Sequence, residues 1–137
     1  MMTEISLNVL DVSENSTRAG ASLVTILVTA DTSADKLTIV IADNGCGMTP
    51  EQAAHVTDPF FTTSTTRKVG IGIPFFKYAA ESTGGSFHIE SEPGKGTTVT
   101  AVFGLSHIDR MPLGDMNATI HNLIVYHPAT DFLYTYT

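Results

Sequence analysis

The chain has 137 residues, with seven Lys and Arg against fourteen Asp and Glu, which gives a formal net charge of −7. This length is enough for one hydrophobic core but not for two, and a hydrophobic content of 42% is too high for intrinsic disorder. The acidic balance argues against a protein that coats nucleic acid or an anionic membrane by bulk electrostatics. The single cysteine, Cys46, excludes a disulfide within the chain and a zinc site built from several thiolates. With neither a leader pattern nor an apolar run that could span a membrane, we expect a cytoplasmic protein.

The first half of the chain predicts a helix followed by a hairpin. Apolar residues at helical spacing predict a helix over residues 5–18, and Gly20 is placed to end it. Segments 23–29 and 37–42 are rich in Val, Ile and Thr and are separated by a polar turn, which predicts an antiparallel hairpin. Residues 49–52, Thr-Pro-Glu-Gln, combine an N-cap Thr with Pro at the first helical position and predict a short helix.

The second half predicts two more helices and three more strands. A helix is expected over residues 74–83, an alternating hairpin over 87–103, a further helix over 115–126 and a final strand over 131–137. The last strand suggests a hairpin-like addition to the sheet or a protein contact. The order of elements predicts a two-layer fold, with helices on one face of a sheet.

Asp11 and Asn15 are spaced by four residues, so they lie on one face of the predicted first helix about one turn apart. A carboxylate and an amide oxygen at this spacing can together hold a hydrated magnesium ion and orient a water. The alternative is that these residues, with Glu14, only form the solvated face of a surface helix.

Residues 43–47, Asp-Asn-Gly-Cys-Gly, leave the apolar strand that ends at Ile41. The two glycines permit a close approach of a ligand that side chains would block. An aspartate directly after a buried strand needs a hydrogen-bond donor, and the exocyclic amino group of a purine is such a donor. The alternative is a glycine-rich turn. The spacing matches neither a phosphate loop nor a dinucleotide fingerprint.

Residues 67–72, Arg-Lys-Val-Gly-Ile-Gly, precede a predicted helix, so free backbone N–H groups and two cationic side chains converge there. This pattern favours an anion site, and the alternative is a glycine-softened helix start. Residues 94–98, Gly-Lys-Gly-Thr-Thr, are a fourth candidate segment, and the alternative is a simple hairpin turn. Four of the seven basic residues gather in this region, which supports a local polyanion ligand: Arg67, Lys68, Lys77 and Lys95.

In this order, these four segments resemble the ATP-binding domain of the GHKL superfamily, which includes sensor histidine kinases, MutL, the GyrB-type topoisomerase subunit and the heat-shock chaperone ATPases. The resemblance covers residues 7–103. The four matching boxes are the N box at 10–21, the G1 box at 43–48, the G2 box at 70–72 and the G3 box at 94–97. The N box is most like that of MutL. Residues 58–63 and 81–85 instead resemble the ATP lid and the following helix of histidine kinases. Four boxes in order at normal spacing are highly specific.

The resemblance implies a fold, two cofactors and a set of site residues. The fold would be a two-layer α/β sandwich of the Bergerat type, an α+β fold with a mixed, mostly antiparallel sheet, and the cofactors would be ATP and Mg²⁺. Asn15 would coordinate the metal, and Asp43 would accept a hydrogen bond from the adenine amino group, with Thr97 and a water beside it. The other implied nucleotide-binding residues are Gly45, Gly47, Met48, Thr62, Arg67, Lys68, Gly70, Ile71 and Gly72.

Asp11 occupies the position at which hydrolysing members carry a water-activating glutamate, and it is one methylene shorter. This puts efficient hydrolysis in doubt, and the histidine-kinase-like lid implies instead a protein kinase that transfers the terminal phosphoryl group of ATP to a partner supplied in trans. Two alternatives stay open: an ATP-hydrolysing conformational switch like MutL, and a regulatory module that binds nucleotide without chemistry.

We expect a single ATP-binding domain over residues 1–137, with a core at about 5–105 and a helix-plus-strand extension of unknown role at 106–137. The expected partners are ATP and a protein acceptor or regulator, with no nucleic acid and no membrane. Because the final strand leaves an edge that needs cover, a homodimer is one arrangement that would supply it.

Overall fold

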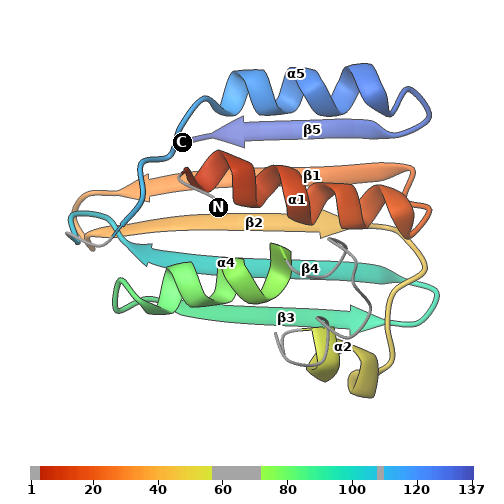
Figure 1. Cartoon of the computed structure of the whole chain (residues 1–137), viewed down its shortest axis with the longest axis horizontal. Helices are drawn as coiled ribbons and strands as arrows, with labels where there is room; N and C mark the ends of the chain where they lie inside the picture. Colours follow the sequence, from red (N-terminus) through yellow and green to blue (C-terminus); the bar gives the residue numbers. More distant parts are fainter. Residues whose placement is uncertain (1–3, 57–71, 108–109) are drawn as a thin grey trace.

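The strands form one five-stranded sheet, and α1, α4 and α5 cover one of its faces (Figure 1). The computed structural model describes residues 4–56, 72–107 and 110–137. The described elements are α1 (Ile5–Arg18), β1 (Leu23–Asp31), β2 (Lys36–Asp43), α2 (Pro50–Val56), α4 (Gly72–Glu81), β3 (Ser86–Glu92), β4 (Gly96–Gly104), α5 (Met116–Tyr126) and β5 (Asp131–Tyr136). The two-layer α+β arrangement predicted from the sequence is confirmed.

The sheet has the strand order β3-β4-β2-β1-β5, and it is antiparallel except where β5 joins β1. The mixed, mostly antiparallel sheet is thus confirmed, but the hairpin-like addition of the last strand is wrong. β4 and β5 run in the same direction because each is parallel to β1, and α5 connects them. A helix that carries the chain back before the next strand produces parallel strands, whereas a hairpin turn cannot.

Alternate residues of the strands point toward the helices and form the core. On the helix side, the ring of Phe76 in α4 lies 5.8 Å from that of Phe103 in β4, measured between centroids. Burial of each large apolar side chain contributes roughly 1.5–3 kcal/mol. The core includes these fully buried side chains from both layers: Ile5, Val9, Ile26, Ile39, Phe76, Phe103 and Leu123. Because α1 packs on this core, its polar residues are held at a fixed distance from the end of β2.

The helix ends follow the signals in the sequence. Thr49 N donates to Gln52 Oε1 at 2.9 Å and Gln52 N donates to Thr49 Oγ1 at 3.1 Å, so the reciprocal cap predicted before α2 is confirmed. α4 begins at Gly72, two residues before the predicted start at Pro74, and the chain leaves it through Gly84 at a φ of +77°. Both predicted helices are therefore present.

Part of the predicted site lies outside the described residues: Thr62, Arg67, Lys68, Gly70 and Ile71. Within residues 4–56, 72–107 and 110–137, no helix has the length and apolar character needed to cross a bilayer.

Candidate nucleotide-binding site

A cavity of about 190 Å³ opens where the C-terminal part of α1 meets the ends of β2 and β4. A larger cleft of about 710 Å³ lies on its β3 side and shares Asp43 and Thr97 with it. The cavity is lined by Val12, Asn15, Ser16, Ala19, Ile41, Asp43, Cys46, Gly47, Met48, Ile73, Thr97 and Val99. The structure therefore brings residues from three of the predicted boxes onto one small apolar cavity with a few polar groups, which is the usual composition of a small-molecule site.

Asp43 is the fixed polar group of this cavity. Its Oδ2 accepts a hydrogen bond from Ser16 Oγ at 2.7 Å, and its Oδ1 accepts one from Gly45 N at 2.8 Å. The two bonds hold the carboxylate in one orientation, and each oxygen keeps a lone pair for a further donor. The antiparallel register also places Asp43 opposite Thr97 on β4. This arrangement can receive a ligand amino group between an aspartate and a threonine.

Ser91, which lines the larger cleft, links two residues of the cavity, Met48 and Thr97. Met48 N donates to Ser91 Oγ at 2.7 Å, and Ser91 Oγ donates to Gly96 O at 3.0 Å. Ser91 Oγ also lies 2.7 Å from Thr97 Oγ1. Because the Ser91 proton is used on Gly96, Thr97 supplies the proton of that last bond, and its oxygen can still accept from a ligand or a water.

The glycines of the loop after β2 are required by the protein's own packing. A side chain at Gly45 would start 2.9 Å from Cβ of Ala19 at the end of α1. Gly47 has a φ of +71°, and a Cβ there would collide with the backbone oxygen of Glu92. The loop is also tied on both sides, since Cys46 N donates to Ala19 O at 2.9 Å and Gly94 N donates to Cys46 O at 2.7 Å. The glycines therefore let the loop fit between α1 and the β3–β4 turn.

Asn15 lines the cavity, and its Oδ1 accepts a hydrogen bond from Arg18 Nη1 at 3.2 Å. Asp11 lies one helical turn earlier on α1, half-buried, and it does not line the cavity. Among the described residues, no group of three or more His, Cys, Asp and Glu side chains could hold a metal ion. A single amide oxygen suits Mg²⁺, which commonly binds through one or two protein oxygens together with phosphate and water. The donor set is thus compatible with a magnesium ion carried by a nucleotide.

Two residues of the site were not predicted as site residues from the sequence, Ser16 and Ser91. Ser16 lies on the apolar face of α1 and is 5% exposed. Because a buried hydroxyl normally has a hydrogen-bond partner, a serine at this position of the apolar pattern was a signal for such a partner. Ser91 alternates correctly with the rest of β3, and nothing in the sequence distinguishes it from a surface serine.

Comparison with known proteins shows which family the chain belongs to. A family model described as histidine kinase-, DNA gyrase B- and HSP90-like ATPase matches residues 1–107. The chain belongs to this family. The chain is accordingly an ATP-binding, kinase-like ATPase domain, and the superfamily expected from the four boxes is confirmed.

Two relatives of this ATPase domain are sensor proteins. The chain is 33% identical to the sensor protein SrrB of Staphylococcus aureus (strain NCTC 8325 / PS 47) over 102 residues, which make up 71% of this chain and 17% of that protein. It is 35% identical over 69 residues to the Bacillus subtilis protein named Probable C4-dicarboxylate sensor kinase, covering 50% of this chain and 13% of that protein. The chain therefore spans less than a fifth of the length of either relative.

Proposed function

We propose that this chain binds ATP with Mg²⁺ in the cavity between α1, β2 and β4 and transfers the terminal phosphoryl group to a partner protein supplied in trans. The observation that carries the proposal is the Asp43 carboxylate, which lines the cavity, is held by Ser16 and Gly45, and belongs to the register partner of Thr97. On binding, the adenine amino group would donate to Asp43 in place of a solvent water. A water bound to Thr97 would form a hydrogen bond with a second atom of the adenine ring.

Other residues of the site would hold the metal and the phosphates. Asn15, on the α1 side of the cavity, would hold the metal, which when bound neutralises charge on the phosphates. Gly70, Ile71 and Gly72 would supply backbone N–H groups to the phosphates, with Arg67 and Lys68 adding positive charge. In the transfer, the acceptor atom of the partner bonds to the terminal phosphorus as the bond from that phosphorus to ADP breaks.

Asp11 favours transfer over hydrolysis. It lies one turn before Asn15 and outside the cavity lining, and its side chain is one methylene shorter than a glutamate. A shorter carboxylate reaches an attacking water at the terminal phosphate less well, and a general base works only within hydrogen-bond distance of its proton. The names of the two relatives, a sensor protein and a sensor kinase, also support the kinase.

The test uses the full chain, ATP labelled in its terminal phosphate, and candidate partner proteins encoded beside it. We expect the label to pass to one of them. Asp43→Asn should lower nucleotide affinity by about ten-fold or more, because a hydrogen bond to a charged acceptor is lost, and should abolish labelling at low ATP. Asp35→Asn is the matched control, since Asp35 bonds Ser106 at the distant β1–β2 turn.

Other outcomes identify the alternatives. If no partner is labelled but ATP is hydrolysed, and Asp11→Asn stops the hydrolysis, the chain is a hydrolysing switch like MutL. Tight binding with neither reaction would indicate a regulatory module, whereas unchanged affinity in Asp43→Asn would contradict all three functions. The cytoplasmic location and the homodimer stay predictions.

A further inference from the structure

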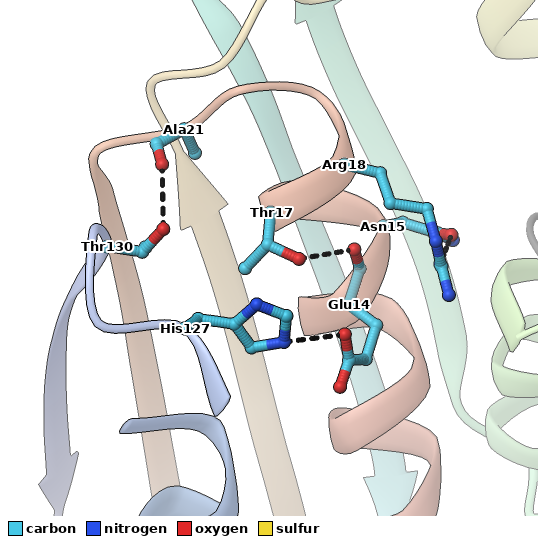
Figure 2. A network of polar contacts seen from close by, with 7 residues as sticks. All are labelled: Glu14, Asn15, Thr17, Arg18, Ala21, His127 and Thr130. Carbon is cyan, nitrogen blue, oxygen red and sulfur yellow. Dashed lines mark hydrogen bonds and ion pairs between the residues drawn. The ribbon is translucent and has the colours of Figure 1, made fainter. Parts of the chain in front are cut away.

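The chain beyond the family match contacts the helix that carries Asn15. In the turn between α5 and β5, His127 Nε2 lies 2.7 Å from Glu14 Oε1 of α1, and Thr130 Oγ1 donates to Ala21 O at 3.1 Å (Figure 2). The His127 and Glu14 side chains are each about three-quarters buried, with exposed fractions of 24% and 26%. The turn is thus docked on the C-terminal end of α1, one residue from Asn15.

This contact changes how the charged residues of α1 pair with each other. Glu14 and Arg18 have the i, i+4 spacing at which a glutamate and a cationic residue ordinarily form an ion pair on a helix. Among the described residues, however, no ion pair joins them. Figure 2 shows the Glu14 carboxylate turned toward His127, and the Arg18 guanidinium beside Asn15, to whose Oδ1 it donates at 3.2 Å.

The Arg18 contact occupies the atom of Asn15 that a metal ion would need. A guanidinium donates hydrogen bonds and carries a positive charge, so a cation approaching Oδ1 is repelled and finds one of the two lone pairs of that oxygen already used. Arg18 therefore opposes metal binding at Asn15 through its charge and through the lone pair that it occupies. Glu14, at the i, i+4 spacing, is an alternative acceptor for Arg18 on the same helix.

We propose that His127 controls metal binding at Asn15 through a chain of side-chain contacts. We call this chain the latch, and its members are His127, Glu14, Arg18 and Asn15. While His127 holds Glu14, Arg18 stays on Asn15 and opposes metal binding. When His127 leaves Glu14, Arg18 pairs with Glu14 and Asn15 Oδ1 becomes available. The extension thereby restrains nucleotide binding, and a partner that lifts the α5–β5 turn would release the restraint. The proposal rests on the proposed role of Asn15.

The latch makes a prediction opposite to that of a purely structural contact. Loss of a contact that only supports α1 would weaken nucleotide binding. Loss of His127 from the latch should instead strengthen nucleotide binding when Mg²⁺ is present. Since Arg18 is exposed and its bond to Asn15 is at the surface, the effect should be modest, about two- to five-fold.

The experiment measures binding of a fluorescent, non-hydrolysable ATP analogue to the full chain while Mg²⁺ is titrated. We expect His127→Ala to lower the Mg²⁺ concentration at half-maximal binding about two- to five-fold, with affinity in EDTA unchanged. Arg18→Gln should lower it similarly, and the double variant should show no further change. His127→Gln, which keeps a donor for Glu14, should behave like the wild type. Thr130→Val is the matched control, because it removes the neighbouring bond to Ala21 and leaves the latch intact.

The outcomes separate the latch from the proposed function. A magnesium midpoint that rises or stays the same in His127→Ala, with wild-type circular dichroism and melting temperature, overturns the latch. If His127→Ala does not fold, Arg18→Gln and His127→Gln decide: an unchanged midpoint in the first or a shifted one in the second overturns it. A wild-type chain that binds no analogue at any Mg²⁺ concentration refutes the proposed function, and the latch with it, at the first step.

Discussion

At the scale of single residues, the orientation of Asp43 depends on a serine of a different element. Ser16 Oγ reaches Asp43 Oδ2 across a separation of 27 residues, and Ser16 itself is 5% exposed. We predict that Ser16→Ala weakens binding of the ATP analogue about three- to ten-fold, or about 0.7–1.4 kcal/mol, because only part of the roughly 1.5–3 kcal/mol of a hydrogen bond to a charged group is passed on to the ligand. Isothermal titration calorimetry in the presence of Mg²⁺ measures the change.

Ser13 provides the control for this prediction on the same helix. It is fully buried, and its Oγ has no hydrogen-bond partner among the described residues. Ser13→Ala should therefore leave nucleotide affinity unchanged and stabilise the fold slightly, if at all. Equal losses of affinity in the two variants would show that the effect comes from α1 as a whole and not from Asp43.

The site residues that sequence could predict are those with a local signal. Asp43 is marked by its place after an apolar strand, and Asn15 and Thr97 by their boxes. Ser16 and Ser91 act through partners on other elements, and such pairings are visible only after β2, β3 and β4 are in register. The Arg18–Asn15 bond was equally hidden, because Glu14 has the i, i+4 spacing that favours pairing with Arg18, and its contact with His127 joins residues far apart in the chain.

At the scale of elements, α1 depends on the C-terminal extension at both ends. Its first turn has no side-chain cap, and Ile5 N and Ser6 N instead donate to Pro112 O and Leu113 O at 2.9 and 2.8 Å. These acceptors satisfy two of the N–H groups that every helix start leaves open. The sequence predicted the limits of α1 from Gly20 and the apolar period, but it could not predict a cap from acceptors more than a hundred residues away.

We propose that the extension and the ATP-binding core unfold as one domain. Leu123 of α5 is completely buried, whereas its neighbour Ile124 is 51% exposed. Leu123→Ala should lower the free energy of unfolding by about 2–5 kcal/mol, because it removes apolar contacts and leaves a cavity. Ile124→Ala should cost far less. Urea unfolding followed by circular dichroism measures both.

The result also tests the domain prediction. In one cooperative domain, Leu123→Ala shifts a single transition to lower urea and leaves its slope unchanged. Two separate transitions, of which only one responds to Leu123→Ala, would show that residues 110–137 fold apart from the core.

At the scale of the whole molecule, the sequence predicted the elements better than their arrangement. Several predicted boundaries have a local cause, such as the positive φ of Gly20 and Gly84 or the reciprocal bonds of Thr49 and Gln52. The place of β5 has no local cause. It pairs with β1, more than a hundred residues earlier, because α5 carries the chain back across the helix layer, and so a strand expected as a hairpin completes the sheet in parallel.

This long-range pairing makes stability at high pH sensitive to Tyr134 on β5. Burial, and secondly the charge of Tyr136, raise the pKa of Tyr134 above its ordinary value of 10.0. The unfolded chain therefore ionises first, so this stabilising contribution is complete below that value and is lost as the pH rises through the folded-state pKa. Urea unfolding between about pH 9 and pH 11 should show a smaller loss of stability in Tyr134→Phe than in the wild type. Tyr126→Phe, at a tyrosine that is 71% exposed, should lose as much as the wild type does. Equal losses in all three proteins would mean that β5 does not bury Tyr134 in solution, and that the fifth strand contributes less to the sheet than its pairing with β1 indicates.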